Sequence, residues 1–173
     1  IITLEDPIEF LHKEKQSLIS QREVGSDTKD FPTALKHIVR QNPDVIIIGE
    51  LRDSETCASA VSAALTGHLV IATLHAADAQ QALERMLNFF PERLREQSAL
   101  DLAYSLQGII SQRLLPAKDE KTRIPAFEIF LVTPQARRVI ANRAFSSIPE
   151  LIKAGAGDGM LSFNRSLLDI YKN

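Results

Sequence analysis

The most constraining feature of this chain is a short apolar segment that ends in a glycine and a glutamate. Residues 45–48 are four consecutive β-branched apolar residues, and Gly49 and Glu50 follow them. So short and apolar a run predicts a strand with both faces covered, as in a parallel sheet between helices. Glu50 then lies at the carboxyl end of the strand, where α/β proteins place their functional groups. The alternative is an ordinary charge at the start of the next helix.

A second apolar segment, at residues 1–4, also runs into carboxylates. Glu5, Asp6 and Glu9 follow it within five positions. Acids that converge on one strand end raise one another's pKa unless a cation or an arginine neutralises them, and Mg²⁺ is the usual counter-ion for such oxygen ligands. The alternative is a solvated turn that begins at Asp6 and Pro7.

The third apolar segment, at residues 69–74, has a histidine at each end. His68 precedes it and fits a structural role, whereas His75 follows it. In a parallel sheet the carboxyl ends of neighbouring strands lie at one edge. Glu9, Glu50 and His75 are therefore predicted to form one site from three loops.

These three segments resemble, in order, the motifs of a known family. Residues 2–10 resemble the Asp box of the secretion and type IV pilus ATPases, 43–53 their Walker B motif and 66–75 their His box. Residues 21–25 and 159–168 extend the likeness to essentially the whole chain. The resemblance implies an α/β fold, a RecA-like P-loop NTPase core with a mostly parallel sheet flanked by helices. It also implies a homohexameric motor for pilus extension, pilus retraction or protein export.

The region between residues 114 and 127 indicates the branch of this family. Extension and type II secretion motors usually carry a zinc-binding tetracysteine insert there, and Cys57 is the only cysteine of this chain, which excludes a four-thiolate site. The chain thus looks most like a pilus-retraction (PilT-type) ATPase that drives twitching motility. Residues 136–142 depart from that branch, because they are a shifted and altered version of its Ala-Ile-Arg-Asn-Leu-Ile-Arg element.

A phosphate-binding P-loop is not found in this sequence. Such a loop needs glycine-rich backbone followed by Lys-Ser or Lys-Thr, and no Gly-Lys pair occurs here. The glycines of 155–159 indicate a helix end followed by a turn. In the family the P-loop lies upstream of the position where this sequence starts. We therefore expect a C-terminal portion of a motor that does not hydrolyse ATP by itself.

The resemblance also implies roles for individual residues, with ATP and Mg²⁺ as the ligands of the intact protein. Glu9 corresponds to the general base that orients the attacking water, and Glu50 to the Walker B acid that holds Mg²⁺ directly or through water. His75 senses the γ-phosphate, and His68 supports its strand. Glu5 and Asp6 position this catalytic group.

Arginines are expected to stabilise the charge of the transition state. Arg22 and Arg52 are the predicted contacts to the nucleotide or to a neighbouring subunit; a loop ion pair of Arg52 with Asp53 is the alternative. Two other functional classes stay open. One is a metal-dependent hydrolase built from Glu5, Asp6, Glu9 and His12, and the other is a non-catalytic assembly module.

Charge and hydropathy limit the partners. A net charge of −2 gives no general attraction for nucleic acid, and no apolar run approaches the roughly 20 residues of a membrane span. The expected location is cytoplasmic, peripheral to the inner membrane through a pilus platform protein.

The pattern along the chain predicts the elements. Residues 10–23 are expected to form a hairpin or an irregular excursion. Helices are expected from Pro32, from a cap at Ser54, from a cap at Asp78 and over 93–105. Strands are expected near 1–4, 44–48, 69–74, 108–114 and 124–132. We expect a partial ATPase domain at 1–132 and an all-helical subdomain at 133–173.

Overall fold

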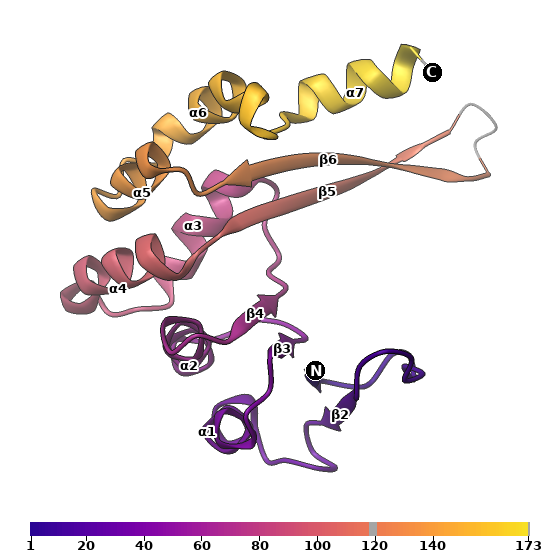
Figure 1. The fold of residues 1–173 in the computed structure, drawn as a ribbon. Coiled ribbons are helices and arrows are strands. Elements are labelled where there is room, and N and C mark those ends of the chain that lie inside the picture. The colour runs from indigo at the N-terminus through magenta and orange to yellow at the C-terminus, as the bar shows by residue number, and fades with distance from the viewer. Residues whose placement is uncertain (118–120, 173) are drawn as a thin grey trace. The chain divides into compact units, whose positions relative to one another are not determined.

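The computed structural model describes residues 1–117 and 121–172 (Figure 1). The chain separates into two compact units, the first at Ile1–Leu74 and the second from His75 onward. The domain boundary predicted at 132/133 lies inside the second unit and stays a prediction.

The first unit contains a four-stranded sheet in the order β2-β1-β3-β4. All three neighbouring pairs are parallel. This confirms the α/β class with a parallel sheet. The strands are β1 (Ile2–Glu5), β2 (Ser20–Glu23), β3 (Val45–Ile48) and β4 (Leu69–Ala72).

Strand β2 corrects the prediction of a hairpin or irregular excursion for residues 10–23. Its four residues pair in parallel with β1, from Ile2 opposite Ser20 to Glu5 opposite Glu23. The strand lies at the edge of the sheet, where polar side chains reach solvent, so it lacks the apolar pattern of a buried strand. The segment before it is irregular, as expected.

Two helices pack with this sheet because each presents one apolar stripe to it. They are α1 (Phe31–Ile38), which continues into the 3₁₀ turn η1 (Val39–Gln41), and α2 (Ser54–Leu65). Leu35 and Ile38 of α1 are almost fully buried, as are Ile46 and Ile48 of β3. Cys57 of α2 is also buried, and this burial raises the pKa of its thiol to about 12. This environment agrees with a core role for that thiol rather than a nucleophilic one.

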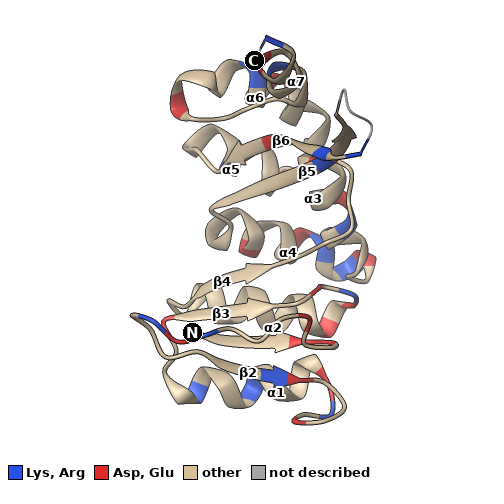
Figure 2. Cartoon of the chain, turned by 90° about the vertical axis from the view of Figure 1, so that its right-hand side faces the viewer, with Lys and Arg blue, Asp and Glu red and all other residues tan. Residues whose placement is uncertain are grey.

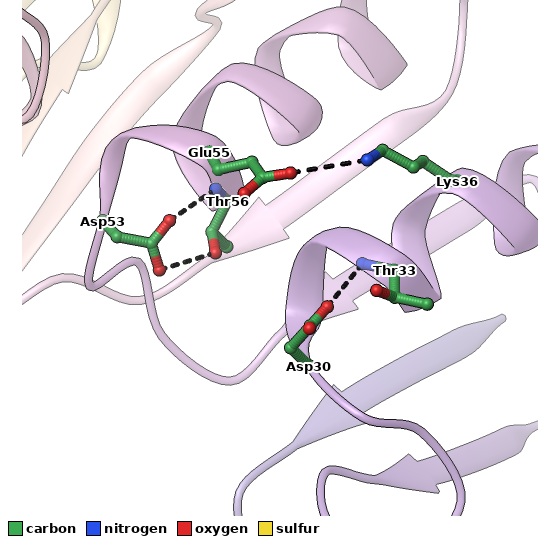
Figure 3. Close-up of polar contacts among 6 residues, drawn as sticks. All are labelled: Asp30, Thr33, Lys36, Asp53, Glu55 and Thr56. Carbon is green, nitrogen blue, oxygen red and sulfur yellow. Dashed lines mark hydrogen bonds and ion pairs between the residues drawn. The ribbon is translucent and has the colours of Figure 1, made fainter.

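Both helices begin at an aspartate cap (Figure 3). The Asp30 carboxylate accepts a hydrogen bond from the Thr33 amide at 2.7 Å. Asp53 accepts from the Thr56 amide at 2.8 Å and from the Thr56 hydroxyl at 2.9 Å. The prediction of Ser54 as the cap is therefore wrong by one residue. Asp53 has the extended backbone of a cap, with φ of −147°.

Replacing Asp53 with alanine is expected to lower the free energy of unfolding by about 1–2 kcal/mol. The first turn of α2 then loses the acceptor of the Thr56 amide and hydroxyl. Urea unfolding followed by circular dichroism measures the change. Ser54→Ala is the matched control and is expected to stay within about 0.5 kcal/mol of the wild type. Equal losses in both variants would contradict the assignment of the cap.

The second unit is organised around an antiparallel hairpin of two long strands. Strands β5 (Gly108–Pro116) and β6 (Arg123–Leu131) pair along their whole length, and Phe130 is fully buried. Helix α7 packs along β6, α3 contacts both strands, and α4 packs against α5 (Figure 1). The predicted Asp78 cap is confirmed, because its carboxylate accepts from the Gln81 amide at 2.9 Å.

The helices of this unit follow the predicted pattern closely. They are α3 (Ala79–Asn88), α4 (Glu92–Ser105), α5 (Pro134–Ala141), α6 (Ile148–Ala154) and α7 (Phe163–Lys172), with 3₁₀ turns η2 (Phe145–Ser147) and η3 (Gly155–Asp158). Gly159 ends η3 with φ of +92°, a conformation that favours glycine. The glycine cluster is thus the helix end and turn that the sequence predicts.

Candidate functional site

Parallel pairing brings the carboxyl ends of β1 and β3 side by side. Leu4 lies opposite Ile48, and the Gly49 amide donates to the Leu4 carbonyl at 2.7 Å. A Cβ added at Gly49 would lie 3.1 Å from that carbonyl oxygen, so a larger residue would press on β1. Glycine at this position lets Glu50 follow directly beside Glu5 and Asp6. Figure 2 shows acidic residues where the strands of the first unit end.

Arg52 joins two of these acids. Its Nη1 donates to Asp6 Oδ2 at 2.8 Å, and its Nη2 donates to Glu50 Oε1 at 2.5 Å. The hydrogen bond to Glu50 is the main reason that the pKa of Arg52 is raised above its usual value. The predicted alternative, an ion pair with Asp53, is not the one found, because Asp53 caps α2. Arg52 is instead the counter-ion of the converging acids.

The Glu5 carboxylate is held by three donors. Thr3 Oγ1 donates to its Oε1 at 2.6 Å and Gln21 Nε2 at 2.9 Å, and the Glu9 amide also donates to this carboxylate. Partial burial alone would raise the pKa of Glu5, but the hydrogen bonds from Thr3, Gln21 and the Glu9 amide lower it overall. Glu5 is therefore ionised at neutral pH and fixes the start of the loop that carries Glu9.

Gln21 is a site residue that the reasoning from single residues missed. Besides bonding Glu5, its Nε2 donates to the Phe10 carbonyl at 2.9 Å, and its Oε1 accepts from the His12 amide at 2.7 Å. Glu23 holds the same loop, because its Oε2 accepts from the Ile8 amide at 3.0 Å. The only sequence signal for Gln21 was its place in the segment 21–25 that resembles the family.

These contacts fix the backbone on both sides of Glu9. The Ile8 amide is bonded to Glu23 on one side, and the Phe10 carbonyl is bonded to Gln21 on the other. The Glu9 side chain itself is exposed to solvent. A carboxylate on a fixed loop that water can reach has the properties that a general base requires.

Thr73 connects the ends of β3 and β4, and it too was missed. Its hydroxyl donates to the Gly49 carbonyl, its amide donates to the Ile48 carbonyl at 3.3 Å, and its own carbonyl accepts from the Leu51 amide at 2.9 Å. The backbone on either side of Glu50 is thereby tied to the neighbouring strand.

Arg22 lies on β2 and is half-buried. Its Nη2 donates to Gln41 Oε1 at 3.3 Å. Its Nε is buried, and no acceptor for it occurs among the described residues. A buried guanidinium nitrogen without an acceptor is costly, so this position suits an additional anionic or carbonyl oxygen.

The two histidines of the predicted site, His68 and His75, occupy different environments. His68 Nδ1 lies 3.1 Å from the Ala63 carbonyl and 3.4 Å from Thr66 Oγ1, so this ring contacts the end of α2 just before β4 begins. His75 is the first residue of the second unit and is exposed. The first unit therefore brings together Glu5, Asp6 and Glu50, and a joint site of Glu9, Glu50 and His75 stays a prediction.

The donor set fits Mg²⁺ bound together with a nucleotide. Within the described residues, no group of three or more His, Cys, Asp and Glu side chains could hold a metal ion by itself. Glu5, Asp6, Glu9 and His12 thus do not form such a group. Magnesium in nucleotide sites needs only one or two protein carboxylates plus phosphate oxygens, and Glu50 with Asp6 nearby supplies such oxygens.

Comparison with known proteins identifies the family. The family model described as "Type II/IV secretion system protein" matches residues 1–153. The type IV pilus ATPase PilU of Pseudomonas aeruginosa is 44% identical over 99% of this chain and 45% of its own length. The type II secretion system protein E of Xanthomonas campestris is 40% identical over 69% of this chain and 19% of its own length.

A solved structure agrees in fold and in extent. The crystal structure of the pilus retraction motor PilT with bound ADP matches with a TM-score of 0.89 and 42% identity, over 99% of this chain and 48% of that chain. The chain thus spans about half the length of the pilus proteins that it matches. The chain belongs to the family of type II/IV secretion system proteins.

Proposed function

We propose that the protein to which this chain belongs is an ATPase that works as a homohexameric motor and drives retraction of a type IV pilus. The observation that carries this proposal is the cluster of Asp6, Glu50 and Arg52 at the carboxyl edge of a parallel sheet. In α/β proteins this edge is where nucleotides bind. The named relatives that match almost the whole chain are pilus ATPases, whereas the secretion relative matches over 69% of it.

In the proposed reaction each residue has a separate task. Glu9 accepts a proton from the water that attacks the γ-phosphate, and Glu5 and Gln21 hold its loop in place. Glu50 would hold Mg²⁺, which neutralises charge on the phosphate oxygens when it is bound. Without Mg²⁺, Arg52 neutralises Glu50 and Asp6. His75 hydrogen-bonds to the γ-phosphate, and His68 supports β4.

Two arginines remain candidates for contacts beyond this cluster. Arg22 has a buried Nε that a phosphate or a neighbouring subunit's oxygen would satisfy. With Mg²⁺ held at Glu50, the Arg52 guanidinium would be available to contact the nucleotide. A ring of subunits that complete one another's sites in this way explains why such a motor works as a hexamer.

The proposed location is the cytoplasmic side of the inner membrane, bound through a pilus platform protein. None of the helices that the structure describes has the length and hydropathy that crossing a bilayer requires. We propose that contact with the membrane runs through this platform protein.

The test of this function is phosphate release from ATP and Mg²⁺ by the intact protein, measured beside its mass in solution. Hydrolysis by hexamers supports the motor. Assembled rings without hydrolysis would favour the non-catalytic assembly module. In cells that lack the protein, a retraction motor leaves more pili on the surface, whereas loss of pili would indicate an extension motor and a defect in export a secretion motor.

Replacing Gln21 with alanine is expected to lower kcat of the intact protein about tenfold with little change in KM for ATP. The reason is that the Glu9 loop loses its bonds at Phe10 and His12 while the nucleotide contacts stay. Steady-state kinetics measure both constants. Gln16→Ala, an exposed glutamine of the same excursion, is the matched control, and an unchanged kcat in Gln21→Ala would remove Gln21 from the site.

A further inference from the structure

The start of α3 is held by two charged side chains of the β5–β6 hairpin. Glu128 Oε1 accepts from the Ala79 amide at 2.9 Å, and Arg113 Nη2 donates to the Ala77 carbonyl at 3.2 Å. The segment 75–78, which precedes α3, includes His75 and the Asp78 cap. The backbone just after His75 is therefore fixed within the second unit by β5 and β6.

The register of the hairpin places both side chains on one face. Glu128 lies opposite Ser111, and Arg113 lies opposite Ala126. Ser111 and Ala126 are buried. Because residues two apart on a strand share a face, Arg113 and Glu128 are diagonal neighbours on this inner face.

Glu128 is in an environment that sets its charge. Burial is the main reason that the pKa of Glu128 is raised, and repulsion from Asp78 adds to it. The Ala79 amide and Arg113 act in the opposite direction. The Ala79 amide and Arg113 therefore stabilise the charged form of Glu128, and the Glu128 carboxylate in turn holds both of these groups in place.

Arg113 also reaches the last helix. Its guanidinium carbon lies 4.4 Å from the centre of the Phe163 ring, and Phe163 is the first residue of α7. The side chains of Asp78, Arg113, Glu128 and Phe163 line one polar cavity. One arginine thus contacts both the segment after His75 and the start of α7.

Helix α7 is fixed to the same hairpin by backbone contacts. Ile129 and Leu161 exchange two backbone hydrogen bonds, at 2.8 and 3.0 Å. The Phe127 amide donates to Ser166 Oγ of α7 at 3.0 Å. Helix α7 and the segment before it are therefore attached directly to β6.

We propose that Arg113 and Glu128 are positioning residues that tie the segment 75–78 to α7, so that a displacement of His75 by the nucleotide reaches the last helix. This inference rests on the proposed function for the role of His75. The Arg113 guanidinium contacts both a carbonyl and an aromatic ring, and the half-buried Glu128 carboxylate beside it accepts from a helix amide. Two states of the motor can therefore differ in which of these contacts are made.

Hydrogen–deuterium exchange of the intact protein, loaded with ATP or with ADP in the presence of Mg²⁺, tests the link. In the wild type we expect the amides of α7 to exchange differently in the two nucleotide states. In Arg113→Ala this difference is lost. In Glu128→Ala the Ala79 amide exchanges about tenfold faster, because it loses a bond to a charged acceptor.

Conservative variants and kinetics separate positioning from plain structural damage. Glu128→Gln keeps an acceptor oxygen, so it is expected to restore protection of Ala79. In Arg113→Ala we expect kcat to fall about tenfold while KM for ATP changes less than about twofold. Arg123→Ala, an exposed arginine of the same hairpin, is the matched control. If Arg113→Ala does not fold, Phe163→Leu removes only the ring and is expected to abolish the response of α7.

Two results would overturn the inference. One is a wild-type exchange rate at Ala79 in Glu128→Ala, and the other is an undiminished nucleotide response of α7 in Arg113→Ala. An intact wild type that binds no ATP would overturn the proposed function, and transmission from the nucleotide with it. The exchange rate at Ala79 would still decide whether Glu128 holds the start of α3.

Discussion

Replacing Glu50 with glutamine in the intact protein is expected to abolish ATP turnover, by at least about a hundredfold in kcat, while ATP still binds. The amide has almost the same size but carries no charge. It therefore holds Mg²⁺ poorly, and it no longer balances Arg52, which donates to Glu50 Oε1 at 2.5 Å. We expect the loss to fall on the chemical step because the proposed role of Glu50 is to hold Mg²⁺ rather than the nucleotide itself.

Phosphate release and equilibrium binding of a fluorescent ATP analogue measure the two effects separately. Glu55→Gln is the matched control, since Glu55 is an exposed glutamate of α2 that pairs only with Lys36 among the contacts described, at 3.4 Å. Unchanged turnover in Glu50→Gln would remove Glu50 from the mechanism. Equal loss of binding and turnover would assign it to nucleotide affinity instead.

Little change in folding stability is expected from the same substitution. Half of the Arg52 side chain is exposed, at 52%, and ion pairs exposed to this degree contribute about 0–1 kcal/mol. A glutamine at position 50 also leaves the salt bridge of Arg52 with Asp6 intact. A defect in turnover with a normal melting transition therefore reports on the site rather than on the fold.

Strands β1 and β3 are predicted correctly from apolar residues that the sheet buries, and β4 from an apolar run most of whose residues are exposed. Ile2 and Leu4 of β1, and Ile46 and Ile48 of β3, are buried apolar residues in short runs, which is a strong signal. Strand β2 was missed because its residues Ser20–Glu23 are polar. An edge strand obtains its stability from backbone pairing to β1, and single-sequence patterns do not register such pairing.

The cap of α2 was misassigned, and the alternative of an Arg52–Asp53 ion pair is not the one found, for related reasons. Asp53 and Ser54 are both good cap residues, and only the backbone angles decide between them. Once Asp53 is the cap, Arg52 turns to Asp6 and Glu50, which are adjacent only through the pairing of β1 with β3. Sequence neighbours are visible in a sequence, but neighbours across a sheet are not.

Gln21 shows the same limit for the site itself. The acids were predicted because each follows an apolar strand, whereas Gln21 has no chemistry of its own. Its importance comes from a register that places β2 beside β1, so that one amide side chain reaches Glu5 and Phe10 and accepts from His12. Residues that act through geometry alone are found from a structure, and those that act through charge from a sequence.

Replacing Glu9 with alanine is expected to lower kcat of the intact protein by about 10²–10⁴-fold with KM for ATP nearly unchanged. Glu9 lies on a loop whose backbone is fixed at Ile8 and Phe10, and its own side chain is exposed, so the substitution removes a carboxylate without disturbing what holds the loop. ATP hydrolysis at equal protein concentration, with saturating Mg²⁺, measures the effect.

Glu14→Ala is the matched control for this experiment, because Glu14 is an exposed glutamate of the same excursion and accepts only a long bond from the Ile19 amide, at 3.3 Å, among the contacts described. Activity lost in Glu9→Ala and kept in Glu14→Ala would establish the general base. Equal activity in the wild type and in Glu9→Ala would reassign the base to Glu50 or Glu5. The bonds that Thr3, Gln21 and the Glu9 amide donate to the Glu5 carboxylate stabilise its charge and weaken it as a base, so the exposed Glu9 is the better candidate.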